Sequence, residues 1–386
     1  MRIALYGHFM YELAVGLRGN PDNEVQLFLD SATLPTCLLD EPLLHDPTFV
    51  KVAPWVTHRE VLRPKNAEIT EHLASFDVAI VTDLGPIFAA SAATEFVFMP
   101  GGTDLTLLPF PVRSRSTRPR GRLDIFAGVV AARMRHGIRA ATSIWGPAFR
   151  PFRLAVERLG CSLGGCLPQA INTKLFSPDV ASPLPNNRSE SITIFHPARM
   201  AFTPDPVLIE IGACKYNDVL LKGFAKAIDL GVDVRLRLTE REGAADQDLG
   251  KQLLSDLKVS DRVEWLSTGT SSHFTWREMV DLYRSSDISS DEFSGWFGLA
   301  ALEGLSCGKP VLNYLEAAVM ESEYPDGHPF LQAQDDDQVC EAITMLTDPG
   351  TRKEIGTASR EWVLAHHDRG VVARKCESML RALGMS

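Results

Sequence analysis

Residues 281–311, DLYRSSDISSDEFSGWFGLAALEGLSCGKPV, contain the pattern that decides the fold. A strand-like run at 287–290 is followed by an apolar helical run that Gly298 opens, and a second strand-like run begins at 309. Buried parallel strands joined by helices give this pattern. Glu303 is the one carboxylate on the apolar helix, and an unpaired buried charge is costly. Glu303 is therefore expected to face either water or groups that donate hydroxyl protons.

The same alternation extends along both halves of the chain. Strand-like runs occur at 2–7, 25–30, 77–83, 95–101, 192–197, 232–238, 262–267, 287–290 and 309–314. Repeated strand–helix units predict an α/β protein with two doubly wound, Rossmann-like domains. Because such sheets bind ligands beyond the carboxyl ends of their strands, we expect a site in a cleft between two facing domains.

The length of 386 residues also favours two domains over one. We predict an N-terminal acceptor-binding domain at 1–178 and a linker rich in Pro, Ser and Asn at 179–191. A C-terminal domain is predicted at 192–360, and a helix at 361–386 that packs back on the N-terminal domain.

The composition excludes several classes of protein. A net charge of −10 argues against nucleic acid as the main partner, and the seven cysteines form no CxxC pair, so neither a zinc site nor a disulfide framework is indicated. No apolar run reaches the roughly 18 residues of a membrane span, and the N-terminal MRIALYGHF is typical of a first strand. The sequence predicts a cytoplasmic protein without a metal.

A basic segment lies at 112–158, where eleven arginines face only Asp124 and Glu157. It is expected to contact an anionic membrane surface or an anionic acceptor, although a solvated basic face is the alternative. The contact is assigned to Arg113, Arg115, Arg118, Arg120, Arg122, Arg133 and Arg135. Apolar anchors for it are expected from Phe126, Trp145, Phe149 and Phe152.

Two cations and a helix start in the second half form a candidate phosphate site. Arg199 follows the strand-like run 192–198 directly, and Lys215 precedes a helix that begins near Asp218. Side chains of this kind, together with the N–H groups that Gly298 exposes at a helix start, bind phosphate. Glu303 lies about one and a half turns into that helix. Its carboxylate can accept hydrogen bonds from the vicinal hydroxyls of a ribose.

Five stretches in this order resemble the retaining GT-B glycosyltransferases of family 4. They are CLPQAINTKLFSP (166–178), KYNDVLLKGFAKAIDLGVDVRLRL (215–238), DRVEWLSTG (261–269), the stretch 281–311, and SREWVLAHH (359–367). The resemblance implies a GT-B enzyme that needs neither cofactor nor metal. Such an enzyme transfers a hexose-type sugar from a nucleotide diphosphate donor to a glycan or lipid-linked acceptor, with the anomeric configuration retained.

Carried over to this sequence, the resemblance implies that Arg199 and Lys215 neutralise the donor diphosphate and that Glu303 holds the ribose. Further donor contacts are implied for the backbone N–H groups of Phe297, Gly298 and Leu299, and base contacts for Leu266 and Ser267.

Three features depart from the family pattern, and one of them is a longer separation between Arg199 and Lys215. The first glutamate of the signature falls on Gly295, which leaves Glu292 or Ser294 as its replacement. The usual histidine of the first domain is replaced by PGGTDL at 100–105, which contains Asp104. We expect catalytic roles for Asp104, His8 and Glu292, with a helix cap as the alternative for Asp104. The acidic run at 334–338 is interpreted as a helix start and not as a metal site.

From the arginine-rich segment and the resemblance together, we expect a role in surface polysaccharide or glycolipid assembly, with peripheral binding on the inner face of the membrane. Two other functions stay open. One is a nucleotide-sugar epimerase or hydrolase on the same fold, and the other is an inactive GT-B binding module.

Overall fold

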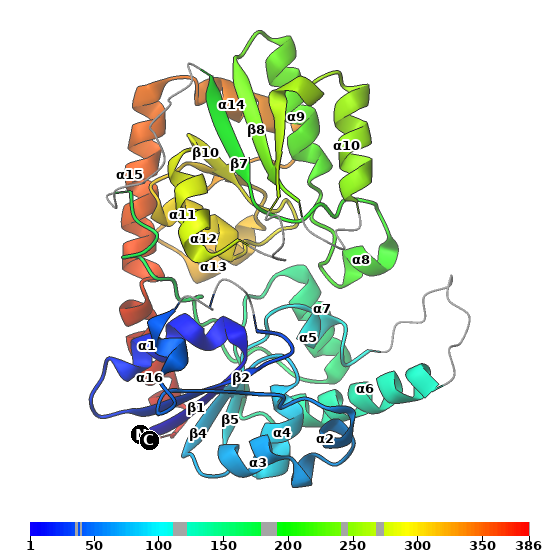
Figure 1. Cartoon of the computed structure of the whole chain (residues 1–386), viewed down its shortest axis with the longest axis vertical. Coiled ribbons are helices and arrows are strands. Elements are labelled where there is room, and N and C mark those ends of the chain that lie inside the picture. The colour runs from blue at the N-terminus through cyan, green and yellow to red at the C-terminus, as the bar shows by residue number, and fades with distance from the viewer. Residues whose placement is uncertain are drawn as a thin grey trace. The chain divides into compact units, whose positions relative to one another are not determined.

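The computed structural model describes residues 1–34, 38, 41–110, 122–178, 191–240, 246–267 and 274–385, with the backbone alone for 122–125. The chain forms two compact units (Figure 1). Unit 1 comprises Met1–Ala170, Glu210–Gly212 and Arg369–Ser386, and unit 2 comprises Ile171–Ile209 and Ala213–Asp368. Residues 171–178, which the sequence analysis assigned to the first domain, thus cluster with unit 2.

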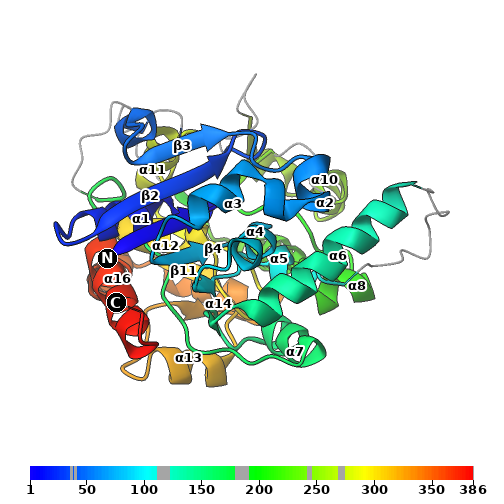
Figure 2. The same cartoon turned by 90° about the horizontal axis from the view of Figure 1, so that it is seen from below.

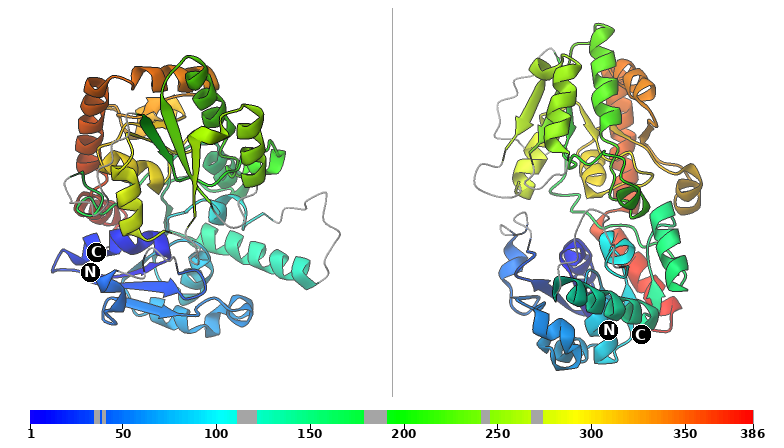
Figure 3. Two further views of the ribbon diagram at one scale, coloured as in Figure 1. Left: turned by 45° about the horizontal axis from the view of Figure 1, so that its top comes forward. Right: turned by 90° about the vertical axis from the view of Figure 1, so that its right-hand side faces the viewer.

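Unit 1 contains a parallel sheet of six strands in the order β3-β2-β1-β4-β5-β6. The strands are β1 (Arg2–Tyr6), β2 (Glu24–Asp30), β3 (Val50–Ala53), β4 (Val78–Val81), β5 (Phe96–Phe98) and β6 (Ser143–Ile144). The α-helices are α1 (Tyr11–Arg18), α2 (His58–Leu62), α3 (Glu68–Leu73), α4 (Gly85–Ala92), α5 (Thr103–Thr106), α6 (Arg122–Ala140), α7 (Arg150–Leu159) and α16 (Arg369–Ala382). Figure 3 shows one end of α6 extending away from this sheet.

Unit 2 contains a second parallel sheet of six strands, in the order β12-β11-β10-β7-β8-β9. The strands are β7 (Ile192–His196), β8 (Val234–Thr239), β9 (Val263–Leu266), β10 (Ile288–Ser290), β11 (Val311–Asn313) and β12 (Leu331–Gln332). The helices are α8 (Pro206–Glu210, whose last residue clusters with unit 1), α9 (Asp218–Asp229), α10 (Gln247–Asp256), α11 (Trp276–Arg284), α12 (Leu299–Ser306), α13 (Ala317–Glu323), α14 (Asp336–Met345) and α15 (Pro349–His366).

Strand composition explains why both sheets are parallel and covered by helices. Every residue of β4, β5, β7, β10 and β11 is buried. A strand buried on both faces tends to a continuous apolar run in place of an alternating pattern, as in VAIV of β4 and FVF of β5. The predicted α/β class with two doubly wound, Rossmann-like domains is confirmed by these sheets.

The C-terminal helix α16 packs against α1 within unit 1 (Figure 2). The Glu377 carboxylate accepts hydrogen bonds from the side-chain amides of Asn20, at 2.8 Å, and Asn23, at 2.7 Å. Arg369 forms an ion pair of 3.1 Å with Glu12, whose side chain is 8% exposed. These polar contacts join the two ends of the chain at the surface of the first sheet.

The order of the strands gives each sheet one topological switch point. In unit 1 the chain adds β2 and β3 on one side of β1 and then starts on the other side with β4. In unit 2 it adds β8 and β9 on one side of β7 and then starts on the other side with β10. Ligands of doubly wound sheets bind at the carboxyl ends of the strands beside such a point. The residues that follow β1, β4, β7 and β10 are therefore the first candidates for function.

Candidate functional site

A series of hydrogen bonds between buried side chains joins the loops at the switch point of unit 2. His196, at the end of β7, lies 2.9 Å from the Ser290 hydroxyl at the end of β10 and 2.8 Å from the Asn217 amide nitrogen. The Asn217 oxygen accepts the Ala201 N–H at 2.9 Å, so its amide nitrogen is the atom that donates to His196 Nε2. His196 therefore carries its proton on Nδ1. This chain fixes the loop 197–201, which carries the exposed Arg199.

Lys215 is attached to the loops that follow β7 and β10. Its N–H donates to the Ala201 carbonyl at 2.5 Å, and its carbonyl accepts the Phe293 N–H at 2.9 Å. Its ammonium group forms an ion pair with the Glu292 carboxylate, and these side chains are 21% and 10% exposed. Burial lowers the pKa of Lys215 to about 8, with the Asp291 carboxylate acting in the opposite direction and the Arg199 charge lowering it further. The two predicted cations are therefore electrostatic neighbours.

The start of helix α12 is joined to the loop that follows β10. The Gly298 N–H donates to the buried Asp291 carboxylate at 2.6 Å. Of the three residues predicted to contact the donor through N–H groups, Gly298 has its N–H engaged by Asp291, Phe297 is buried among aromatic rings, and Leu299 is the first residue of α12. An incoming phosphate must use the other N–H groups of the helix start or displace Asp291. Asp291 is not among the residues predicted from the sequence, although an aspartate directly after a strand is a sequence signal for a site residue.

Glu303 has a partner within the fold, which answers the question raised by its apolar helix. The Tyr283 hydroxyl lies 2.9 Å from Glu303 Oε2 and 2.9 Å from the Ala300 carbonyl oxygen, so it shares its proton between these acceptors. Burial and the Glu303 charge raise the pKa of Tyr283, which keeps this hydroxyl a donor. Glu303 is half-buried, and the hydrogen bond from Tyr283 holds its carboxylate in place.

Gly295 adopts a backbone conformation that favours glycine, with a φ of 102°. The three heavy atoms nearest to a Cβ placed there all belong to Glu316, with Cγ at 3.2 Å and Oε1 at 3.3 Å. Backbone hydrogen bonds hold this approach, because the Gly295 N–H donates to Tyr314 at 3.1 Å and its carbonyl accepts from Glu316 at 2.9 Å. The carboxylate beside Gly295 is thus Glu316, whereas Glu292 pairs with Lys215. The Ser294 hydroxyl is buried, with no hydrogen-bond partner among the described residues.

The residues predicted to contact a base lie at the end of β9. The Leu266 carbonyl accepts the Glu240 N–H at 2.8 Å, and Ser267 is exposed directly after it. Strand β8 separates β9 from β7 in the sheet. The structure therefore places Leu266 and Ser267 at the carboxyl edge of the same sheet, two strands from the switch point.

Asp104 of unit 1 is buried and forms hydrogen bonds with the loops that follow β4 and β5. Its carboxylate accepts hydrogen bonds from the N–H groups of Asp83, Gly101, Gly102 and Leu105 and from the Thr82 hydroxyl, at 2.8 to 3.0 Å. The side chain is 3% exposed. This bonding favours a structural role, as a brace between two loops, over the predicted catalytic role of Asp104. His8 follows β1 in a short 3-10 helix and is the predicted residue that stands at the switch point of unit 1.

The basic segment is described in part. Arg113, Arg115, Arg118 and Arg120 lie outside the described residues, as does the side chain of Arg122. Arg133 donates to the Leu62 carbonyl at 2.8 Å and Arg135 to the Pro109 carbonyl at 2.7 Å, so both guanidinium groups hold loops of unit 1.

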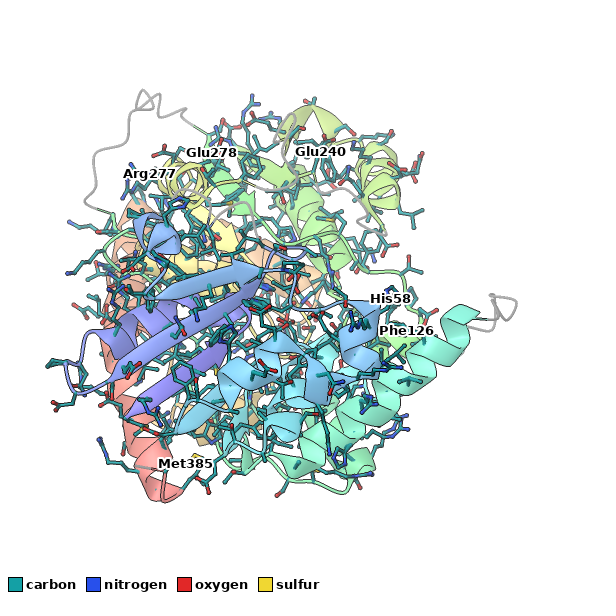
Figure 4. The ribbon with its side chains drawn as sticks, turned by 60° about the horizontal axis from the view of Figure 1, so that its bottom comes forward. His58, Phe126, Glu240, Arg277, Glu278 and Met385 are labelled. Carbon is teal, nitrogen blue, oxygen red and sulfur yellow. The ribbon has the colours of Figure 1, made fainter. Side chains whose placement is uncertain are left out.

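Most of the residues predicted to be apolar anchors of this segment are not on the surface. Trp145, Phe149 and Phe152 are 1%, 8% and 4% exposed, so they belong to the core and cannot anchor a surface. Phe126 stands on α6 beside His58 of α2, with ring centroids 4.4 Å apart (Figure 4). The prediction failed because Trp145 directly follows β6, and Phe149 and Phe152 lie at the start of α7, where they are buried in the core.

The acidic run at 334–338 forms the start of α14. Asp335 caps the helix by accepting the Gln338 N–H at 2.9 Å, and Lys226 pairs with Asp336 at 2.9 Å and with Asp337 at 2.5 Å. The carboxylate oxygens of the three aspartates lie within 4.8 Å of one another. The lysine and the cap account for this cluster as a helix start.

Among the described residues, no helix is both long enough and apolar enough to cross a membrane.

The curated relatives of the chain match only part of its length. No protein-family model matches the chain. The D-inositol 3-phosphate glycosyltransferase of Thermobifida fusca is 27% identical over 222 residues, which is 54% of this chain and 48% of that protein. The enzyme of the same name from Rhodococcus jostii is 29% identical over 149 residues, or 35% of this chain and 31% of that protein. The chain thus spans at most about half the length of the curated relatives it matches.

Solved structures match over nearly the whole chain. HepE of Anabaena in complex with UDP has a TM-score of 0.65 at 15% identity, covering 99% of this chain and 100% of HepE. Sucrose-phosphate synthase of Thermosynechococcus elongatus has a TM-score of 0.64 at 14% identity, covering 100% of this chain and 99% of that chain. At this identity the likeness establishes the fold, which is the two-domain architecture called GT-B.

Proposed function

We propose that the protein is a glycosyltransferase that takes a sugar from a nucleotide diphosphate donor bound by unit 2. One observation carries the proposal: at the β7/β10 switch point the Arg199 charge acts on Lys215, and Asp291, which also acts on Lys215, accepts the Gly298 N–H at the start of the helix that holds Glu303. A cation pair and a helix start suit a diphosphate, and a fixed carboxylate suits a diol. The named activity of the two curated relatives and the UDP in the HepE complex support the same conclusion.

In this proposal the site acts mainly on the leaving group. When the bond between sugar and phosphate breaks, the nucleotide diphosphate gains negative charge, which Arg199 and Lys215 would stabilise from fixed positions. Lys215 would exchange Glu292 for a phosphate oxygen on donor binding. Glu303, held by Tyr283, would accept hydrogen bonds from the ribose hydroxyls. Phe297, Gly298 and Leu299 at the helix start, Gly295 beside Glu316, and Leu266 and Ser267 at the end of β9 stay predicted donor contacts.

The finer features come from the family resemblance. We propose retention of configuration and independence of metal ions and cofactors. Unit 1 is proposed to bind the acceptor, a glycan or lipid-linked molecule, in surface polysaccharide or glycolipid assembly at the membrane surface. UDP-glucose is the donor to test first, because HepE has been solved with it. Inositol phosphate is the acceptor to test first, because it is named for the curated relatives.

Binding and turnover test the proposal separately. A nucleotide or nucleotide sugar at about 100 times its dissociation constant should stabilise the protein by about 2.7 kcal/mol in thermal unfolding. UDP-, GDP- and ADP-sugars should be compared, with and without EDTA. Lys215→Ala should reduce this stabilisation to about 0.4–1.4 kcal/mol, while Lys222→Ala, on the following helix, should preserve it. No shift with any of these ligands would contradict the proposal.

Incubation with donor alone separates transfer from the alternatives. A transferase should release nucleotide at a rate that rises with acceptor concentration, and NMR of the product should show the anomeric configuration of the donor. Conversion of donor without acceptor would favour an epimerase or hydrolase. Tight nucleotide binding without turnover on any acceptor would favour an inactive binding module.

A further inference from the structure

The switch point of unit 1 holds a pair of titratable side chains that the proposed donor site does not use. His8 follows β1 and Asp83 follows β4, the two strands between which the chain reverses its direction of sheet growth. His8 Nδ1 lies 3.9 Å from Asp83 Oδ2, and the two side chains are 26% and 41% exposed. Ligands of doubly wound sheets bind at this position.

The loops that carry this pair are held together tightly. Gly7 has a φ of 113°, and a Cβ there would lie 2.0 Å from Thr82 Cγ2, so the loop after β1 touches the loop after β4. A Cβ on Gly101 would lie 2.9 Å from the Phe9 ring, so the loop after β5 touches the loop after β1. Asp104 joins the loops after β4 and β5 through its hydrogen bonds. The platform beneath His8 and Asp83 is therefore rigid.

Asp83 is kept in an unfavourable conformation on this platform. Its φ is 53°, which is uncommon outside glycine and costs free energy that the surrounding structure must supply. Burial raises the pKa of Asp83 to about 7, with Asp104 and Asp30 as nearby like charges, and burial lowers the pKa of His8. Perturbed pKa values of this kind cluster at functional sites.

The geometry of the pair fits one oxygen atom of a ligand. A distance of 3.9 Å is too long for a direct hydrogen bond, and the buried His8 Nδ1 has no hydrogen-bond partner among the described residues. An oxygen placed about 2.8 Å from both atoms would make roughly a right angle between them. A hydroxyl satisfies both sides, because it accepts from a protonated Nδ1 and donates to the Asp83 carboxylate.

The surroundings of the pair favour a neutral ligand with an apolar face. Phe9 is 43% exposed, and its ring centroid lies 4.0 Å from that of His8. A Cβ on Gly102 would meet nothing within 4 Å, so this side of the loop is open. Asp104 and Asp30 act as like charges on Asp83, and such charges disfavour a phosphate at this place. Sugars and cyclic polyols combine hydroxyls with an apolar C–H face.

We infer that His8 and Asp83 bind one hydroxyl of a neutral sugar or cyclic polyol while Phe9 packs against its C–H face. The inference rests on the proposed function only in making this molecule, or the neutral part of a larger one, the acceptor. It names Asp83, which the sequence analysis did not select, as the partner of His8, and it assigns any anionic part of the acceptor to another place.

NMR of the histidine side chains in the 386-residue chain tests this inference without turnover. Titration with myo-inositol and with glucose, up to about 100 mM, should shift the His8 resonances, which His8→Gln identifies. Asp83→Asn should reduce the shift at least tenfold, because asparagine tolerates the φ of 53° but loses the charge. Glu95→Gln is the matched control, since Glu95 is exposed beside the amino end of β5. His8 resonances unmoved by both probes, or moved equally in Asp83→Asn, would overturn the inference.

A second measurement distinguishes this inference from the proposed function. Asp83→Asn should lower acceptor-dependent transfer at least tenfold while the dissociation constant for UDP changes less than twofold. Inorganic phosphate should move the His8 resonances less than myo-inositol does at equal concentration, and a larger effect of phosphate would contradict the choice of a neutral ligand. Failure of the wild-type protein to bind any nucleotide would refute the donor site and leave the NMR result to decide this one.

Discussion

Lys215 and Glu292 form an ion pair in which both side chains are largely buried, at the carboxyl edge of the second sheet. The Glu292 carboxylate thus pairs with the same ammonium group that, in the proposed function, binds a diphosphate. Donor binding would therefore be an exchange of one anion for another. The buried lysine then keeps an anionic partner before and after binding, which avoids the cost of an uncompensated buried charge.

Removal of the ammonium group should weaken nucleotide binding. A hydrogen bond to a charged group contributes about 1.5–3 kcal/mol, which corresponds to about 10- to 100-fold in affinity. We expect this loss for UDP on Lys215→Ala, measured by isothermal titration calorimetry. Lys222→Ala removes a lysine paired with Asp218 on α9 and should change affinity less than twofold. Equal affinities for wild type and Lys215→Ala would show that the diphosphate binds elsewhere.

The pH dependence of nucleotide binding should follow the titration of Lys215. Because burial lowers its pKa to about 8, the ammonium form predominates below pH 8 and is lost above it. Affinity should be constant between pH 6.5 and 7.5 and should fall by up to about tenfold per pH unit above 8. Lys215→Arg should remove this fall, because arginine stays charged. Glu292→Gln removes an anionic partner and should move the midpoint to lower pH, and a midpoint that rises would contradict the assignment.

The conformation of Gly295 predicts a specific cost of substitution. Gly295→Ala should destabilise the protein by about 1–3 kcal/mol, because a φ of 102° disfavours a side chain and the Cβ presses on Glu316. Gly231→Ala isolates the backbone contribution, since Gly231 has a φ of 87° and nothing within 4 Å of its Cβ. Gly295→Ala should therefore cost more free energy of unfolding than Gly231→Ala. In urea unfolding, adding Glu316→Ala to Gly295→Ala should recover this difference and no more.

Two roles of Asp104 are separated by one conservative substitution. If the carboxylate is a brace, Asp104→Asn should destabilise unit 1 by about 2–4 kcal/mol, because an amide NH₂ would face N–H donors that then lack an acceptor. The dissociation constant for UDP should stay unchanged at a temperature where the variant is folded. Normal stability with lost turnover would restore the catalytic role predicted from the sequence.

The sequence predicted the sheets well because their strands are buried on both faces. Runs such as Val78–Val81 and Phe96–Phe98 are apolar throughout, and that property can be recognised without knowledge of contacts. The positions of Arg199 and Lys215 were also predictable, since each directly follows or precedes a recognisable element.

The partners of these residues could not be predicted. Asp83 and His8 are 75 positions apart and meet because β1 pairs with β4. Glu316 reaches Gly295 through an isolated bridge between Gly295 and Leu315. Such contacts depend on the order of strands in the sheet. The burial of Phe152 and Val156, by contrast, was visible in their helical spacing on α7.

The chain path between the two units limits how the protein can be divided. Unit 1 is assembled from three separate segments, and the last of them, Arg369–Ser386, supplies α16. Expression of 1–170 alone would strip the cover from α1 and leave Glu12 without Arg369. No single cut yields both halves intact. Separate study of the first half calls for a gene in which the terminal segment is spliced directly behind residue 170.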